Sequence, residues 1–167
     1  MPRTHPAALP PAELLKSCSE TRTRRSGPGG QHRNKTETAV VLVHAPTGIS
    51  AEASERRSQA ENRREALHRL RLRLALEHRE PAGMHVSHTW RSRVRGRQLV
   101  VSSAHEDFPA LVAEALDRLY AATFETSLVA EQLGVTGTQL VRLFKKSTAA
   151  WVALNRCRKS LGLPELR

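Results

Sequence analysis

The triplet Gly29-Gly30-Gln31 has the residue types and spacing best suited to chemistry in this sequence. Glycine has no Cβ and tolerates positive φ, so the backbone at Gly29 and Gly30 could approach a reacting group closely. A third glycine and a proline stand just before them and exclude regular structure, which predicts a loop over residues 26–35. Basic side chains flank the triplet on both sides, and phosphate is their expected partner: Arg24, Arg25, Arg33 and Lys35.

The charge balance also indicates a polyanionic partner. The 167 residues include 27 lysines and arginines against 16 aspartates and glutamates, a formal net charge of +11. Residues 1–106 hold 19 basic and 10 acidic side chains, residues 107–141 hold one and five, and residues 142–167 hold seven and one. The chain therefore has a basic first part, an acidic stretch and a basic end.

Three strands are predicted around the glycine-rich loop. Residues 18–25 suit a short polar strand, and residues 38–44, TAVVLVH, are β-branched and apolar. The sequence Ala-Pro-Thr-Gly over residues 45–48 indicates a turn. Residues 49–53 then suit the returning strand of a hairpin.

A long helix is predicted next. Ser58 and Glu61 have the spacing of a capping box, so Ser58 is the expected N-cap, and Pro81 and Gly83 would end the helix. Four apolar residues at helical spacing are expected to pack on the sheet: Ala60, Leu67, Leu70 and Leu74. A solvated basic face and direct contact with RNA explain the surrounding arginines equally well: Arg63, Arg64, Arg69, Arg71 and Arg73.

The first part would end in a strand pair, residues 86–90 and 98–102, joined through the basic sequence RSRVRGR. On such a strand His85 and His88 point to opposite faces. None of the eight histidines shows metal-ligand spacing, so we expect no metal site.

Residues 107–167 are predicted to be helical. The segment 129–146, VAEQLGVTGTQLVRLFKK, reads as helix, glycine turn, helix. We favour a plain helical hairpin, while a DNA-binding helix-turn-helix stays open. In the second case the recognition helix would present four side chains: Thr138, Gln139, Arg142 and Lys146.

Three motifs resemble the class I peptide-chain release factors and the stand-alone ribosome-rescue hydrolases related to them. The first is RRSGPGGQHRNK over residues 24–35, and the second runs through residues 38–44 to Pro-Thr-Gly-Ile at 46–49. The third, Arg-Ser-Gln at residues 57–59 followed by Asn62, resembles the family's RSQ-x-x-N helix start. The motifs keep the family's order and spacing, and the resemblance covers roughly residues 18–80.

The resemblance implies that Gly29, Gly30 and Gln31 lie at the reaction centre, where the ester bond of peptidyl-tRNA is hydrolysed in the ribosomal peptidyl-transferase centre. The backbone N–H of Gln31 would donate to the developing negative charge, a contribution worth roughly 10²–10³ in rate. The Gln31 side chain would limit the nucleophile to water, and in the family this glutamine is also methylated. The implied contacts with ribosomal and transfer RNA come from the flanking residues: Arg24, Arg25, Arg33, Asn34 and Lys35.

Some features depart from the family or extend it. The family usually has a small apolar residue where Arg33 stands. Gln59 and Asn62 lie at i, i+3 on one helix face and are expected to brace the loop or the sheet. We expect no codon-reading domain, since the chain has no room for one. The disordered basic tail of rescue hydrolases is also replaced here by a folded segment with a short basic end.

The sequence thus predicts an α+β fold, a small mixed β-sheet with one long packed helix, followed by a small all-α domain. The expected limits are a flexible lead over residues 1–17, the catalytic domain over 18–106 and the helical domain over 107–167. No apolar run could span a bilayer. Cys18 and Cys157 are expected to be free thiols in a reducing compartment.

The predicted function is codon-independent hydrolysis of peptidyl-tRNA on stalled ribosomes by a cytoplasmic monomer. Its partners would be large-subunit ribosomal RNA and peptidyl-tRNA, with no cofactor, no metal and no membrane. Two other functions stay open: a non-catalytic accessory factor that binds ribosomes or RNA, and a helix-turn-helix DNA-binding regulator.

Overall fold

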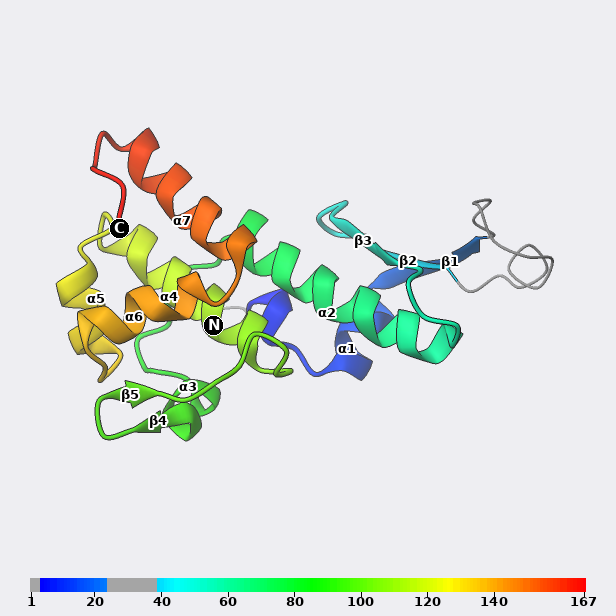
Figure 1. The fold of residues 1–167 in the computed structure, drawn as a ribbon, viewed down its shortest axis with the longest axis horizontal. Coiled ribbons are helices and arrows are strands. Elements are labelled where there is room, and N and C mark those ends of the chain that lie inside the picture. Colours follow the sequence, from blue (N-terminus) through cyan, green and yellow to red (C-terminus); the bar gives the residue numbers. More distant parts are fainter. Residues whose placement is uncertain (1–3, 24–38) are drawn as a thin grey trace.

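The computed structural model describes residues 4–23 and 39–167, and it has the α+β class that the sequence predicts. Helix α2 (Gln59–Glu77) is the long central element. Figure 1 shows it running from a small sheet at one end of the molecule to a group of helices at the other. No helix within these described residues is long and apolar enough to cross a lipid bilayer.

The sheet consists of β1 (Cys18–Thr23), β2 (Ala39–His44) and β3 (Ser50–Ala53), in that order and with antiparallel pairing throughout the described strands. All three strands were predicted, although the sheet was expected to be mixed. Burial alternates along β2 because one face of the strand is covered: Val40 and Leu42 are fully buried, whereas Val41 and Val43 are half-buried. The tight β2–β3 turn contains Gly48 at φ +71°, a conformation that favours glycine.

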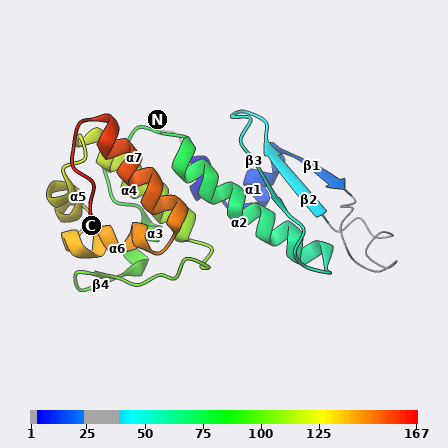
Figure 2. The same ribbon diagram turned by 45° about the horizontal axis from the view of Figure 1, so that its top comes forward.

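Helix α2 begins as predicted, because the Ser58 side chain accepts a hydrogen bond from the N–H of Glu61. It packs across β2 and β3, as the two views in Figures 1 and 2 agree. Ala66, Leu70 and Leu74 are fully buried on its sheet side. The predicted stripe is therefore right at Leu70 and Leu74, half-buried at Leu67 and wrong at Ala60, which is exposed.

The N-terminal segment differs from the flexible lead expected over residues 1–17. Residues Pro6–Ala8 form a 3-10 turn and Pro11–Lys16 form α1. Ala7 and Leu14 are fully buried in the core, so this segment is packed. His5 caps the first turn: its Nδ1 accepts from the N–H of Ala7 at 3.0 Å, and its Nε2–H donates to the carbonyl of His78 at 3.2 Å.

His5 makes the fold sensitive to acid. Burial lowers its pKa from 6.5 to about 4, because it penalises the charged ring, and the hydrogen bond to the carbonyl of His78 opposes this shift only in part. A lowered pKa stabilises the fold above pH 6.5, and that contribution is lost as the pH falls toward 4. We expect the free energy of unfolding to drop by on the order of 3 kcal/mol over this range. His5→Asn keeps a capping acceptor and should lack this part of the pH slope in urea titrations; parallel slopes would contradict the assignment.

The strand predicted over residues 86–90 is wrong, because α3 (His88–Arg93) occupies this place. The Ser87 side chain caps α3 by accepting from the N–H of Trp90. Trp90 is fully buried, and its Nε1–H donates to the carbonyl of Leu133 at 2.9 Å. His88 therefore lies on a helix, and the argument from opposite strand faces does not apply. Only a short hairpin follows, β4 (Val94–Arg95) and β5 (Gln98–Leu99).

Four helices form the rest of the described chain: α4 (Phe108–Ala121), α5 (Thr126–Gln132), α6 (Gly137–Lys145) and α7 (Thr148–Ser160). The predicted helix-turn-helix is α5–α6, with Gly134 at φ +69° in the turn. Buried side chains of the sheet, α2 and α4–α7 form one connected cluster. The core therefore has no gap at residue 106. Cys18 and Cys157 are free thiols, as predicted.

Candidate functional site

The residues predicted to form the reaction centre and to bind RNA lie outside the described residues: Gly29, Gly30, Gln31, Arg24, Arg25, Arg33, Asn34 and Lys35. The structure does describe the strands on either side of them. Thr23, the last residue of β1, pairs with Ala39, the first residue of β2. The two ends of the segment 24–38 are therefore held next to each other by a six-residue antiparallel ladder.

An ion pair ties this ladder to α2. The Nε of Arg63 donates to the carboxylate of Glu20 on β1 at 2.7 Å, and Arg22 approaches the same carboxylate at 3.4 Å. The hydrogen bond from Arg63 lowers the pKa of Glu20 below its usual value. The carboxylate thus stays ionised at neutral pH, which suits a structural link better than proton transfer.

Asn62 holds the connection between β3 and α2. Its side chain is fully buried, with Oδ1 accepting from the N–H of Arg56 and Nδ2 donating to the carbonyl of Arg56, both at 2.9 Å. One amide thereby satisfies both backbone groups of a single residue. The sequence predicted that this asparagine braces the loop or the sheet, and the hydrogen bonds described here hold the connection at Arg56.

Replacing Asn62 by alanine should reduce stability clearly. The substitution removes two hydrogen bonds to the backbone of Arg56, which costs on the order of 1–3 kcal/mol. Arg64→Ala, an exposed change on the same helix, should stay within about 0.5 kcal/mol and serves as the control. Urea denaturation of both variants measures the difference, and equal midpoints would show that the Asn62 bracket adds no stability.

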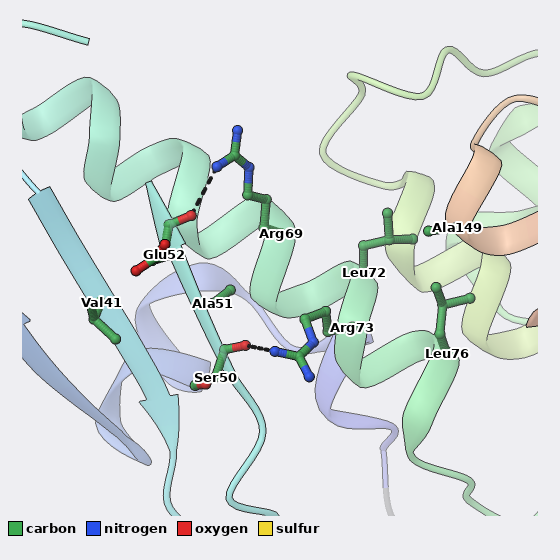
Figure 3. Close-up of a pocket in the computed structure, with 9 residues that line it drawn as sticks. All are labelled: Val41, Ser50, Ala51, Glu52, Arg69, Leu72, Arg73, Leu76 and Ala149. Carbon is green, nitrogen blue, oxygen red and sulfur yellow. Dashed lines mark hydrogen bonds between the residues drawn. The ribbon is translucent and has the colours of Figure 1, made fainter. Parts of the chain in front are cut away.

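Arginines on α2 also cover the open edge of β3 (Figure 3). Arg69 donates to the carbonyl of Glu52 at 2.9 Å, and Arg73 donates to the carbonyl of Ser50. These contacts border an open hollow of about 500 Å³ whose walls also include Val41, Leu72 and Leu76. Without these contacts the carbonyls of β3 could pair with a strand of another molecule, so the two arginines protect the edge from such pairing.

Arg69 and Arg71 make further contacts within the protein. Arg69 also contacts Glu55 at 2.8 Å, which lowers the pKa of Glu55 to about 2. Arg71 is buried and donates to the carbonyls of Ala7 at 3.0 Å and Glu106 at 2.7 Å. The sequence grouped Arg71 with a solvated or RNA-binding face, and its burial corrects that grouping. The charge pattern of the sequence gives no indication that Arg71 has a structural role.

A family model, the RF-1 domain, matches residues 14–104, which is more than half of the chain. The chain belongs to the RF-1 domain family. The matched range contains the braced ladder, α2, α3 and also the segment 24–38 with its Gly-Gly-Gln sequence. It stops four residues before α4, so α4–α7 lie outside the RF-1 domain match.

Curated relatives share the same partial match. Peptide chain release factor 1 of Verminephrobacter eiseniae is 51% identical over 77 residues, covering 44% of this chain and 20% of the relative. Peptide chain release factor 1-like, mitochondrial, of Mus musculus is 53% identical over 57 residues, covering 34% and 15%. Peptide chain release factor 2 of Caulobacter vibrioides is 51% identical over 76 residues, covering 42% and 20%. The alignments span about one fifth or less of each relative.

Proposed function

We propose that this protein hydrolyses the ester bond of peptidyl-tRNA on the ribosome and releases the nascent peptide. The observation that carries the proposal is the RF-1 domain match, which extends across the whole Gly-Gly-Gln segment. Relatives named peptide chain release factors, at about half identity, point to the same activity.

The proposed reaction is attack of water on the ester carbonyl. Negative charge then develops on the tetrahedral centre and on the leaving 3′-oxygen of the tRNA. The backbone N–H of Gln31 is the proposed donor to that charge, and Gly29 and Gly30 let the backbone come close enough. The ribosome supplies the surrounding groups, and no metal or cofactor is part of the proposal. Arg24, Arg25, Arg33, Asn34 and Lys35 are proposed to contact RNA phosphates.

The described scaffold supports a positioning role. Enzymes lose rate steeply when a catalytic group moves by about 1 Å, so a reacting loop needs rigid anchors. Here the strands flanking residues 24–38 are tied to α2 through Glu20 and Arg63, and α2 is tied in turn to the connection at Arg56 through Asn62. These supports leave the chemistry to the loop and its RNA surroundings.

The finer part of the proposal is that release needs no stop codon. The residues outside the RF-1 match fold as α4–α7 and share the core of the sheet, which favours a fixed accessory part over a separate codon reader. Release should be measured on ribosomes carrying a stop codon, a sense codon or no codon in the A site. Equal or faster release without a codon is expected; release confined to the stop codon would refute codon independence.

The proposal also covers where the protein acts: in the cytoplasm, as a monomer, on stalled ribosomes. A non-catalytic accessory factor is the nearest alternative. It predicts ribosome binding without any peptide release, which the same assay detects. The intact Gly29-Gly30-Gln31 sequence favours catalysis, since an accessory factor has no stated need for it.

A further inference from the structure

The strongest unexplained feature is a cluster of exposed cations formed by two separate elements. The β4–β5 hairpin brings Arg95 and Arg97 to its tip, where Gly96 has φ +60° and makes a tight two-residue turn. Helix α6 and its C-cap supply Arg142, Lys145 and Lys146. These five residues are all exposed, and we call them the basic surface.

Contacts between the hairpin and α6 fix these cations relative to one another. The N–H of Thr136, the N-cap of α6, donates to the carbonyl of Arg97 at 3.3 Å, and the N–H of Leu99 donates to Oε1 of Gln139 at 3.4 Å. Arg142 stands three residues after Gln139 and so lies on the same side of the helix. Lys145 and Lys146 follow three and four residues later, on the next turn. These contacts place the cations of the hairpin and those of α6 on adjoining elements.

The basic surface differs from the arginine-rich helix α2 in its lack of acidic partners. On α2, Arg63, Arg69 and Arg73 each pair with a glutamate within 3.1 Å. Among the described residues no ion pair involves any member of the basic surface, whereas the nearby Arg93 is paired with Asp107 at 2.7 Å. Cations gathered on adjoining elements without acidic partners attract anions, so an anionic ligand suits this surface.

The acidic stretch of residues 107–141 does not neutralise this surface. Three of its five carboxylates are used elsewhere: Asp107 binds Arg93, Asp117 binds Arg79 at 2.7 Å, and Glu114 binds the Ser87 side chain and Arg118. The other two, Glu125 and Glu131, are exposed and form no ion pair among the described residues.

The same contacts argue against α6 as a DNA-reading helix. A helix-turn-helix reads bases with the N-terminal residues of its second helix. Here that end is occupied by the hairpin: Gln139 accepts from Leu99, and Thr136 both contacts Arg97 and caps the N–H of Gln139. The cations come later in the helix, with Lys145 Nζ 5.0 Å from the centroid of the Trp151 ring, and this position suits phosphates and not base edges.

We infer that the basic surface binds the phosphate backbone of folded ribosomal RNA and anchors the protein at a second place, apart from residues 24–38. The choice of ribosomal RNA over other RNA rests on the proposed function. The basic surface includes residues on both sides of the domain boundary predicted after residue 106. The hairpin and α6 share one core, in which the indole of Trp90 donates to the carbonyl of Leu133. Deleting residues 107–167 would thus disturb the hairpin as well, and point variants are the sharper test.

Two triple variants of the full-length protein separate this surface from net charge. The first replaces Arg95, Arg142 and Lys146 by glutamine. The matched control replaces Arg156, Lys159 and Arg167 by glutamine. These three cations are exposed and lie at the basic end, so both variants carry the same net charge. Ribosome affinity is measured between about 50 and 200 mM salt, where phosphate contacts give steep salt dependence.

The first variant should bind ribosomes about 10- to 100-fold more weakly near physiological salt, and the slope of log affinity against log salt should fall by about 2–3. The control variant should lose less than about threefold. Equal losses in both, or no loss in the first, would overturn the inference. A third variant, Arg95→Lys and Arg142→Lys, keeps the charge and should bind nearly as well as the wild type.

Two further measurements distinguish the inferred RNA anchor from the proposed catalytic function and from DNA binding. Peptide release at saturating ribosome should be unchanged in the first variant, because the surface anchors and does not react. If the wild-type protein binds ribosomes without releasing peptide, the proposed function fails while the binding comparison still decides the anchor. Tight, sequence-selective binding of duplex DNA that the first variant loses would overturn the RNA assignment and support a DNA-binding regulator.

Discussion

Gly30→Ala should lower the single-turnover rate of peptide release by at least about 100- to 1,000-fold, and Gln31→Ala, which keeps the backbone N–H, should lower it less. The alanine at position 30 adds a Cβ where the backbone is proposed to approach the ester, and it also restricts φ. Removing the Gln31 side chain takes away the group proposed to limit the nucleophile to water. Release of a labelled peptide from saturated, stalled ribosomes measures both rates.

Ribosome affinity should change little in these loop variants, because both substitutions leave the net charge untouched. The double variant Arg24→Glu and Arg25→Glu provides the contrast, because it reverses two charges. It should weaken ribosome binding steeply at every salt concentration. Release at the wild-type rate by both Gly30→Ala and Gln31→Ala would show that the Gly-Gly-Gln sequence is not the reaction centre.

Trp90→Ala should destabilise the whole chain by about 3–5 kcal/mol. Trp90 is fully buried, and its indole N–H satisfies the carbonyl of Leu133, which caps the end of α5. The substitution removes both the packing and that hydrogen bond. Since α3 belongs to the RF-1 match and α5 does not, the loss tests whether the two parts are stabilised by one core.

Trp90→Phe is the control for this prediction. It retains most of the buried apolar surface and loses the hydrogen bond, so about 1–2 kcal/mol should be lost. Urea unfolding followed by far-ultraviolet circular dichroism should show one cooperative transition for both variants. A loss below about 1 kcal/mol for Trp90→Ala, or two separate transitions in the wild type, would contradict a shared core.

Sequence patterns predicted those elements that depend on local signals. The β-branched run over residues 38–44 and the Ser58 cap gave β2 and the start of α2 within one or two residues. The glycine turn between α5 and α6 was equally visible, because Gly134 adopts a positive φ there. In each case the deciding interaction lies within a few residues along the chain.

Elements decided by distant contacts were missed. The alternating sequence of residues 86–90 suggests a strand, but the burial of Trp90 against Leu133, 43 residues away, favours α3. The Pro- and Ala-rich start suggested a flexible lead, yet Ala7 is buried and its carbonyl accepts from Arg71. Nothing in the local sequence distinguishes Arg71 from the exposed Arg64.

The candidate site shows the same division. Its motif was recognisable from glycine and basic residues in order, and the RF-1 match covers the same residues. The ion pair that ties β1 to α2 was not recognisable from the sequence, because Glu20 and Arg63 lie 43 positions apart. The basic surface likewise needs a hairpin and a helix from different parts of the sequence.

Release of labelled peptide by the wild-type protein, from ribosomes stalled at the end of an mRNA without a stop codon, tests the central claim most directly. The same peptidyl-tRNA free in solution provides the reference. We expect rapid, saturable release on the ribosome and a rate near the spontaneous one in solution, because the reaction needs the peptidyl-transferase centre around the loop. Release on the ribosome no faster than spontaneous hydrolysis, at protein concentrations that saturate binding, would contradict the proposed function.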